Sequence, residues 1–278
     1  MSRLVHLSDL HFGRARPELL APLSDAINAA HPDLVVVSGD LTQRARSREF
    51  AAAREFLDGL GARWLAVPGN HDIPLYQPWD RFLKPFRKYR ENIALDLEPC
   101  HEGEDYLVAG LNTVDRFAGQ RGRARAGAIR RVCSLFDGGP DDRFNILMAH
   151  HPFEQDHASH KTPMKRAEPM LDRLKACGTH VVLSGHLHMW HTGPFLTRPG
   201  HVGPIQVHAG TSLSSRLRGE VNDFALLDMT GDRLTVTRMA VEADGTDFTE
   251  RTQARFKRQG AGLVPLDGSE IDGDAGQL

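Results

Sequence analysis

Five short apolar runs in this chain of 278 residues each end in polar residues of the kinds that bind metal ions. The most constraining run is VVVSGDL at residues 35–41, whose β-branched residues are typical of a strand buried on both faces. It places one carboxylate, Asp40, at the end of that strand. The other polar clusters stand at 9–11, 69–72, 150–152 and 185–188. Because ligands gather at the strand ends of α/β folds, the five clusters predict one shared site.

Between these runs, apolar residues recur at three- and four-residue steps, which is the spacing of amphipathic helices. Helices are predicted at 17–30, 47–60 and 163–177, and after the basic turn at 119–125. Further strands are predicted at 3–8, 106–113 and 204–212, with an antiparallel hairpin at 223–241 that turns at 230–233. Strands that alternate with helices indicate an α/β fold, with helices on both faces of one sheet or of two stacked sheets.

Composition excludes several classes of protein. The formal charge of -2 gives no global basic field, so no stable nucleic-acid partner is expected. The N-terminus lacks the pattern of a signal peptide, and no apolar run is long enough to span a membrane, which predicts a cytoplasmic protein. The three cysteines Cys100, Cys133 and Cys177 are odd in number and widely spaced, which argues against disulfides and for a reducing compartment.

Two segments depart from the strand–helix pattern. Residues 74–98 are proline-punctuated, aromatic and basic. They predict either a surface helix with solvated cations, or a lid or cap beside the site where Arg87, Lys88 or Arg90 meets a substrate phosphate. Residues 244–278 are polar, rich in Gly and Asp and weakly patterned, so we expect a C-terminal tail with a flexible end after a domain at 1–243.

The polar clusters combine carboxylates, imidazoles and one amide without a thiolate. Asp9 and His11 are two residues apart, so on an extended backbone their side chains face the same way. This ligand set suits Mn²⁺, Fe or Zn²⁺ and suits Ca²⁺ less well. One shared carboxylate holds two such cations about 3.5–4 Å apart, and a water between them gives a hydroxide directed at phosphorus. The clusters therefore predict a metal site whose ligand types suit two-metal hydrolysis.

The five blocks, in this order, resemble the calcineurin-like metallophosphoesterase superfamily over roughly residues 3 to 240. The resemblance implies a four-layer α/β/β/α sandwich with a dinuclear metal centre between the sheets, followed by the C-terminal antiparallel hairpin. It also implies ligand roles, with Asp40 bridging the two ions. The implied ligands are Asp9, His11 and His188 at the first ion, and Asn70, His150 and His186 at the second. His150 is preferred to His151 because the family ligand stands two residues before the proline.

Residues beside the implied ligands carry further expectations. His71 directly follows Asn70, and we expect it to stabilise a phosphoryl oxygen or to protonate the leaving alkoxide. Asp72 orients either the loop or the imidazole. Glycine precedes three of the ligand blocks, where the backbone must turn sharply and come close to the ions.

The blocks also narrow the substrate. Ser/Thr protein phosphatases of this superfamily continue the second block as Gly-Asp-x-x-Asp-Arg-Gly and end the third in Glu, whereas this chain has GDLTQRA at 39–45 and Asp72. The chain looks most like the bacterial class III cyclic-nucleotide phosphodiesterase branch. We therefore expect hydrolysis of small phosphodiesters, with cyclic nucleotides among the candidates. Five residues are candidates for the pocket rim: Arg44, His151, His208, Thr211 and Arg216.

Two other functions stay open. A pyrophosphohydrolase acting on a nucleotide-sugar lipid precursor would use residues 74–98 as a lipid-facing cap, with an apolar groove beside the metals. A non-catalytic scaffold is disfavoured because all seven implied ligands and His71 are present. Relatives are frequently dimers, so a homodimer formed through the hairpin or through residues 74–98 is also a candidate.

Overall fold

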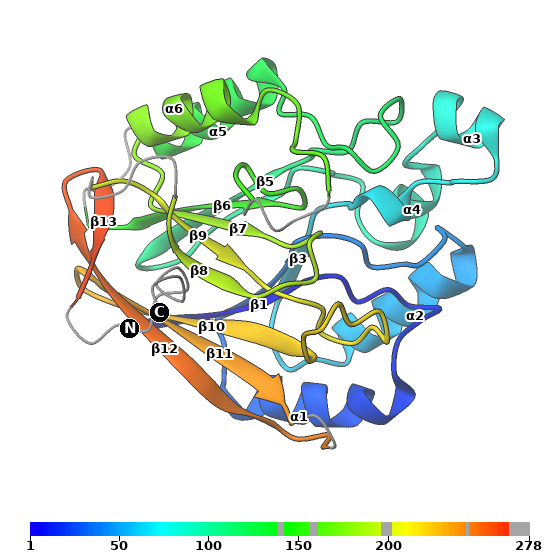
Figure 1. Cartoon of the computed structure of the whole chain (residues 1–278), viewed down its shortest axis with the longest axis horizontal. Coiled ribbons are helices and arrows are strands. Elements are labelled where there is room, and N and C mark those ends of the chain that lie inside the picture. The colour runs from blue at the N-terminus through cyan, green and yellow to red at the C-terminus, as the bar shows by residue number, and fades with distance from the viewer. Residues whose placement is uncertain (138–141, 156–160, 196–201, 243–244, 267–278) are drawn as a thin grey trace.

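Two stacked β-sheets form the centre of the molecule, and helices cover both outer faces in the computed structural model (Figure 1). The structure describes residues 1–137, 142–155, 161–195, 202–242 and 245–266. The layers are stacked in the order helices, first sheet, second sheet, helices. The predicted four-layer α/β/β/α sandwich is therefore confirmed.

The first sheet has seven strands in the order β13-β12-β11-β10-β1-β2-β3. Its strands are β1 Ser2–Leu7, β2 Leu34–Val37, β3 Trp64–Ala66, β10 Asp223–Thr230, β11 Arg233–Val241, β12 Phe248–Gln259 and β13 Gly262–Pro265. β1 pairs in parallel with β2 and β2 with β3, whereas β1 pairs antiparallel with β10. The predicted hairpin is therefore confirmed as β10 and β11, and Gly231 in its turn has a left-handed φ of 60°.

The second sheet has six strands in the order β4-β5-β6-β7-β9-β8. Its strands are β4 Cys100–Glu102, β5 Tyr106–Leu111, β6 Phe144–Ala149, β7 Val181–Ser184, β8 His191–Pro194 and β9 Ile205–His208. The four central strands are parallel, as continuous apolar runs buried on both faces require.

Three apolar layers hold these elements together. Strand residues such as Val36, Ile146 and Leu183 fill the layer between the sheets. A second layer packs α1 and α2 on the first sheet, and a third packs α5 and α6 on the second (Figure 1). The helices are η1 Pro17–Leu19, α1 Leu20–Ala29, α2 Ser47–Asp58, η2 Asn70–Asp72, α3 Pro78–Leu83, α4 Arg87–Asn92, α5 Ala126–Phe136 and α6 Ala167–Ala176.

The sequence predicted a tail from residue 244, but the structure has two strands there, β12 and β13. β12 pairs with β11 along its length, and Ala254, Phe256 and Leu263 are buried in the layer between the sheets. Polar and charged residues fill most positions of FTERTQARFKRQ, so its apolar pattern does not indicate a strand. Residues 267–278, where the flexible end was expected, lie outside the described part of the chain.

The expectation of unpaired cysteines is also corrected. Cys133 of α5 and Cys177, just after α6, form a disulfide whose Cα atoms are 5.3 Å apart. Their separation of 44 residues gave no sequence signal, because only the packing of α5 against α6 brings them together. The inference of a reducing compartment depended on unpaired cysteines and loses that support.

Residues 74–98 form two short helices with different surroundings. Tyr89 of α4 is fully buried, and its hydroxyl donates to the carbonyl of Ala66 at the end of β3. Trp79 and Leu83 of α3 are exposed. No helix in the described residues is long and apolar enough to cross a membrane.

The role of β12 in the fold predicts a large effect of one substitution. Phe256→Ala removes a fully buried ring and should lower the free energy of unfolding by about 3 to 5 kcal/mol. Lys257→Ala is the matched control, because this neighbouring side chain is half-exposed and should change stability by at most about 0.5 kcal/mol. Urea denaturation followed by circular dichroism measures both. Equal small effects would contradict the packing of β12.

Candidate metal centre

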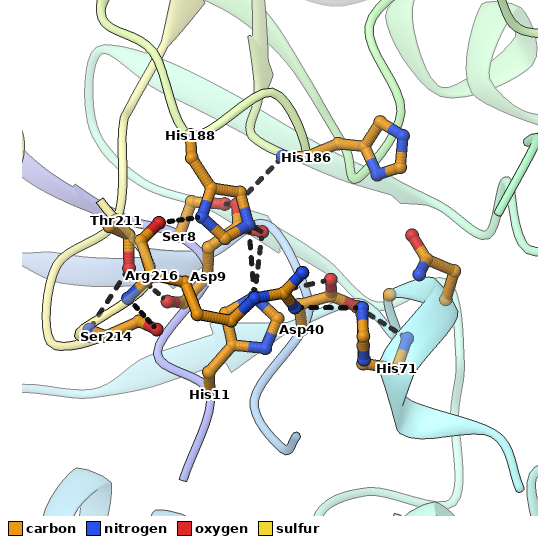
Figure 2. A network of polar contacts seen from close by, with 12 residues as sticks. Ser8, Asp9, His11, Asp40, His71, His186, His188, Thr211, Ser214 and Arg216 are labelled. Atoms are coloured by element: carbon orange, nitrogen blue, oxygen red, sulfur yellow. Dashed lines mark hydrogen bonds and ion pairs between the residues drawn. The ribbon is translucent and has the colours of Figure 1, made fainter. Parts of the chain in front are cut away.

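The five predicted clusters lie together where β1, β2, β3, β6 and β7 end. Figure 2 shows Asp9, His11 and Asp40 facing His188, with His71 at the side. Five of the implied ligands have a left-handed backbone: Asp9, His11, Asp40, His186 and His188, with φ between 47° and 70°. The expectation that Asp9 and His11 converge on an extended strand is therefore corrected, because β1 ends at Leu7 and the two residues lie in a tight loop. Such backbone costs energy and is concentrated at functional sites.

Asp9, His11 and His188 form the first group. The Nε2 atom of His188 lies 3.1 Å from Oδ1 of Asp9, and Nε2 of His11 lies 3.5 Å from the same oxygen. The two Nε2 atoms are 3.2 Å apart. The other oxygen of Asp9 accepts hydrogen bonds from Ser8 Oγ and from the backbone N–H of His186. These bonds turn Oδ1 of Asp9 toward the histidines.

Asn70, His150 and His186 form the second group. The Nε2 atom of His150 lies 3.2 Å from Oδ1 of Asn70 and 3.3 Å from Nδ1 of His186. All three side chains are buried or nearly so. His151 stands beside them, but its ring is used elsewhere: Nε2 donates to the carbonyl of Gln120 and Nδ1 lies 2.8 Å from Thr113 Oγ1.

Asp40 lies between the two groups. Its Oδ2 atom is 3.3 Å from Nε2 of His150 and 3.7 Å from Nε2 of His11. Its Oδ1 atom accepts the backbone N–H of His71 at 2.7 Å. One carboxylate therefore contacts a histidine of each group while the loop after β3 holds it in place.

Backbone carbonyls fix the orientation of three imidazoles. Nδ1 donates to the carbonyl of Ser38 in His150, of Arg216 in His188 and of Gln43 in His71, at 2.9–3.0 Å. A neutral ring that donates through Nδ1 has a lone pair on Nε2, so these Nε2 atoms are acceptors. In His188 and His150, that lone pair faces other acceptors, namely carboxylate or amide oxygens.

This arrangement fits divalent cations. Acceptor atoms that face each other at about 3 Å in a buried site repel one another unless a cation or proton lies between them. Four sets of three His and Asp ligand atoms in the described residues lie within 4.8 Å of one another, including Asp9–His11–His188 and Asp9–Asp40–His150. Nitrogen and oxygen donors without thiolate suit Mn²⁺, Fe or Zn²⁺.

The charges in the site also favour binding of a cation. Burial would raise the pKa of Asp40, but the charges of His150 and His71 hold its pKa well below the usual range. Burial would lower the pKa of His150, but Asp40 raises the pKa of that imidazole to about 9, so Nε2 of His150 binds a positive charge, either a proton or a cation that takes the place of the proton. Asp40 therefore stays ionised at neutral pH, and its surroundings attract positive charge.

Asp72 orients the loops rather than an imidazole. Its carboxylate accepts the backbone N–H groups of Leu41, Thr42 and Gly69 at 2.9–3.1 Å, which ties the loop after β2 to the loop after β3. Burial and the nearby Asp40 raise the pKa of Asp72 to about 7. Of the two roles that the sequence left open for Asp72, these hydrogen bonds favour orientation of the loop over orientation of the imidazole.

Glycine is required where those loops touch. Gly39 has a left-handed φ of 99°, and a Cβ there would lie 2.8 Å from the backbone nitrogen of Gly69. A Cβ on Gly185 would collide with Ser8 and Asp9. The loops can therefore approach each other only without these side chains.

The five rim candidates have different surroundings. His151 and Thr211 are buried, and both are engaged in hydrogen bonds; Thr211 Oγ1 donates to the carbonyl of Asp9. His208 is buried against the ring of His191. These three side chains are not open to a substrate. Only Arg44 and Arg216 are half-exposed.

Arg216 reaches His71 across the site (Figure 2). Its Nη1 atom lies 3.3 Å from Nε2 of His71, and its backbone carbonyl orients His188. Ser8 and Ser38 also contribute, through a hydroxyl and a carbonyl, and the sequence did not single them out. A serine before an aspartate is too common to be a signal, and a backbone carbonyl carries none.

Comparisons with known proteins identify the family of the chain. A family model described as calcineurin-like phosphoesterase matches residues 2–190. A probable cyclic nucleotide phosphodiesterase, RPA0124 of Rhodopseudomonas palustris, is 24% identical over 269 residues, which cover 89% of this chain and 95% of the relative.

Two further relatives match over shorter stretches. The glycerophosphodiester phosphodiesterase GpdQ of Enterobacter lignolyticus is 36% identical over 80 residues, which cover 25% of this chain and 29% of the relative. The UDP-2,3-diacylglucosamine pyrophosphatase LpxG of Chlamydia muridarum is 34% identical over 77 residues, which cover 27% of this chain and 23% of the relative. The chain thus spans less than a third of either of these relatives.

The fold has solved counterparts. The purple acid phosphatase PPD1 from yellow lupin superimposes with a TM-score of 0.68 at 14% identity, covering 93% of this chain and 54% of the other. At that identity the likeness shows the fold alone. The family match over more than half of the chain, together with this fold, shows that the chain belongs to the calcineurin-like phosphoesterase family.

Proposed function

We propose that the chain is a phosphodiesterase that holds two divalent metal ions between its sheets. The observation that carries the proposal is the set of imidazole nitrogens and carboxylate oxygens that face one another as acceptors. Asp9, His11 and His188 would hold one ion and Asn70, His150 and His186 the other. Asp40 would bridge the two, because its Oδ2 atom faces both His11 and His150.

When bound, two such ions supply a water of lowered pKa as nucleophile and neutralise the phosphate oxygens. Mn²⁺, Fe and Zn²⁺ all suit these donors. The remaining work falls to residues of the chain. Asp72 and the glycine turns hold the ligand loops in contact, and the carbonyls of Ser38 and Arg216 keep Nε2 of His150 and His188 turned inward.

His71 would handle the leaving group. Its Nδ1–H is held by the carbonyl of Gln43, so only Nε2 exchanges a proton with a substrate. Burial lowers the pKa of His71, Asp40 opposes that shift, and the charges of His11 and Arg216 lower the pKa further. The lowered pKa favours the neutral ring, so Nε2 of His71 would take up a proton from solvent before giving that proton to an alkoxide. Arg216, 3.3 Å from that nitrogen, would bind a phosphate oxygen at the same place.

Small phosphodiesters, cyclic nucleotides included, are the proposed substrates. Support comes from RPA0124, a probable cyclic nucleotide phosphodiesterase aligned over most of both chains. Further support comes from GpdQ, a glycerophosphodiester phosphodiesterase. The Gln43–Arg44 pair in place of Asp-Arg also separates the chain from protein phosphatases.

A pyrophosphohydrolase acting on a nucleotide-sugar lipid is the second candidate. The match to LpxG, a UDP-2,3-diacylglucosamine pyrophosphatase, favours it. That function requires an apolar groove beside the metals. The structure has a groove of about 790 Å³ along residues 83–95, but its lining contains none of the implied ligands. We therefore rank this candidate second, and a scaffold last because every implied ligand is retained.

Metal content separates the proposed roles of Asp40 and His71. Asp40→Ala removes the shared ligand and should leave fewer than two ions per chain and no measurable turnover of bis-p-nitrophenyl phosphate. His71→Ala should keep two ions while kcat falls by about 10²- to 10⁴-fold. Inductively coupled plasma mass spectrometry gives the ion count. His101→Ala, which removes an imidazole from β4, is the control. Loss of the ions in His71→Ala would refute the assignment of metal binding to Asp40 and of leaving-group chemistry to His71.

Arg216 should act on the substrate and not on the metals. Arg216→Ala should lower kcat/KM for bis-p-nitrophenyl phosphate by about 10- to 100-fold with the ion count unchanged. Arg218→Ala is the matched control, because it removes the same charge from an exposed position in the same loop. Similar kinetics for both variants would exclude a phosphate contact by Arg216.

A substrate panel with Mn²⁺ decides the ester class. Bis-p-nitrophenyl phosphate, cAMP, 2′,3′-cyclic nucleotides and glycerophosphodiesters should be hydrolysed faster than mono-p-nitrophenyl phosphate. A UDP-sugar in the same panel tests the second candidate. A clear preference for the monoester would contradict the proposal that the chain is a phosphodiesterase.

A further inference from the structure

Large apolar side chains are exposed together around α3, and none of them is an implied metal ligand. Trp79 is 80% exposed, Leu83 70% and Phe117 69%, and Tyr76 is also exposed. Trp79 and Leu83 are four residues apart and so share a face of α3. The ring of Phe82 stacks on Phe117 with centroids 5.6 Å apart, which joins α3 to the loop at 114–121. Exposed apolar residues gathered in this way mark an interaction site.

A buried arginine holds this surface in one shape. Arg81 is almost fully buried and donates to the backbone carbonyls of Pro74, Arg116 and Gly119 at 3.1–3.3 Å. Three carbonyls from two segments are thus tied to one guanidinium. The exposed rings therefore stand on a preorganised base rather than on a free loop. Figure 1 shows α3 at the edge of the molecule.

Positive charge adjoins the exposed rings. The groove of about 790 Å³ runs beside Leu83 and Phe117 and is lined by six cationic residues but only two acidic ones. The cations are Lys84, Arg87, Arg90, Arg116, Arg123 and Arg125. Glu91 is paired with Arg87, which also contacts Asp80. Among the described residues, no ion pair is recorded for Lys84 or Arg123. The chain as a whole carries a charge of -2, so the excess of positive charge is local.

We propose that this aromatic–basic surface, made of Tyr76, Trp79, Phe82, Leu83, Phe117 and the cationic groove, binds the surface of a bilayer that contains anionic phospholipid. Trp and Tyr are suited to the interface between lipid and water, and adjoining Lys and Arg attract anionic headgroups. The groove would take the headgroup phosphate while Trp79 and Leu83 enter the interface. This binding is independent of the proposed phosphodiesterase activity.

Vesicle binding tests the proposal on the full-length protein. The wild type should co-sediment with vesicles of phosphatidylglycerol and phosphatidylcholine and not with phosphatidylcholine alone. Trp79→Ser with Leu83→Ser, and separately Lys84→Glu with Arg123→Glu, should weaken binding by about tenfold or more. Arg48→Glu with Lys257→Glu is the control for charge, because these exposed residues lie on α2 and β12. Raising NaCl from about 50 to about 500 mM should release the protein.

Tryptophan fluorescence gives an independent readout. The chain has three tryptophans, and the exposed Trp79 should shift its emission to the blue on binding to anionic vesicles. The shift should disappear in Trp79→Phe and persist in Trp64→Phe. Hydrolysis of bis-p-nitrophenyl phosphate should be unchanged in every one of these variants, which separates failure of this proposal from failure of the catalytic one.

Three results would overturn the proposal. One is no binding to anionic vesicles at low salt, and another is equal binding to phosphatidylcholine alone. The third is a wild-type dimer in sedimentation velocity that becomes a monomer in Trp79→Ser with Leu83→Ser without any vesicle binding. That result would assign the surface to a second copy of the chain.

Discussion

The carboxylate of Asp40 is the contact on which the site depends. His11 follows β1 of the first sheet and His150 follows β6 of the second, so Oδ2 of Asp40 faces a histidine from each sheet. Its Oδ1 atom binds the backbone of the loop after β3. A buried carboxylate is costly unless positive charge compensates it, and this cluster of acceptors provides a place for cations. The packing of the two sheets and the chemistry of the site are thus one arrangement.

This arrangement requires a strained backbone at several of the implied ligands. Asp9, His11, Asp40, His186 and His188 all have left-handed φ, which residues with a Cβ rarely adopt. Surrounding contacts hold them there: Thr211 and Ser8 bind Asp9, and Asp72 binds the turn after Asp40. The hydrophobic layers on either side of the sheets supply the stability that strained loops need.

The sequence predicted most of the fold and which polar clusters lie near one another. Continuous β-branched runs identified β2 and β7, and the polar residues at their ends converge as predicted. It did not predict which rim candidates are open, because the burial of His151 depends on Thr113 and Gln120, which are distant in sequence. It missed β12, whose outer face is polar, and the Cys133–Cys177 disulfide, which only helix packing brings together. Local patterns report strand ends well and tertiary contacts poorly.

Anomalous diffraction from crystals grown with Mn²⁺ shows whether two ions share Asp40. We expect two anomalous peaks at the Mn edge, one among Asp9, His11 and His188 and the other among Asn70, His150 and His186, with Asp40 bound to both. A single peak, or two peaks of which only one contacts Asp40, would contradict this expectation.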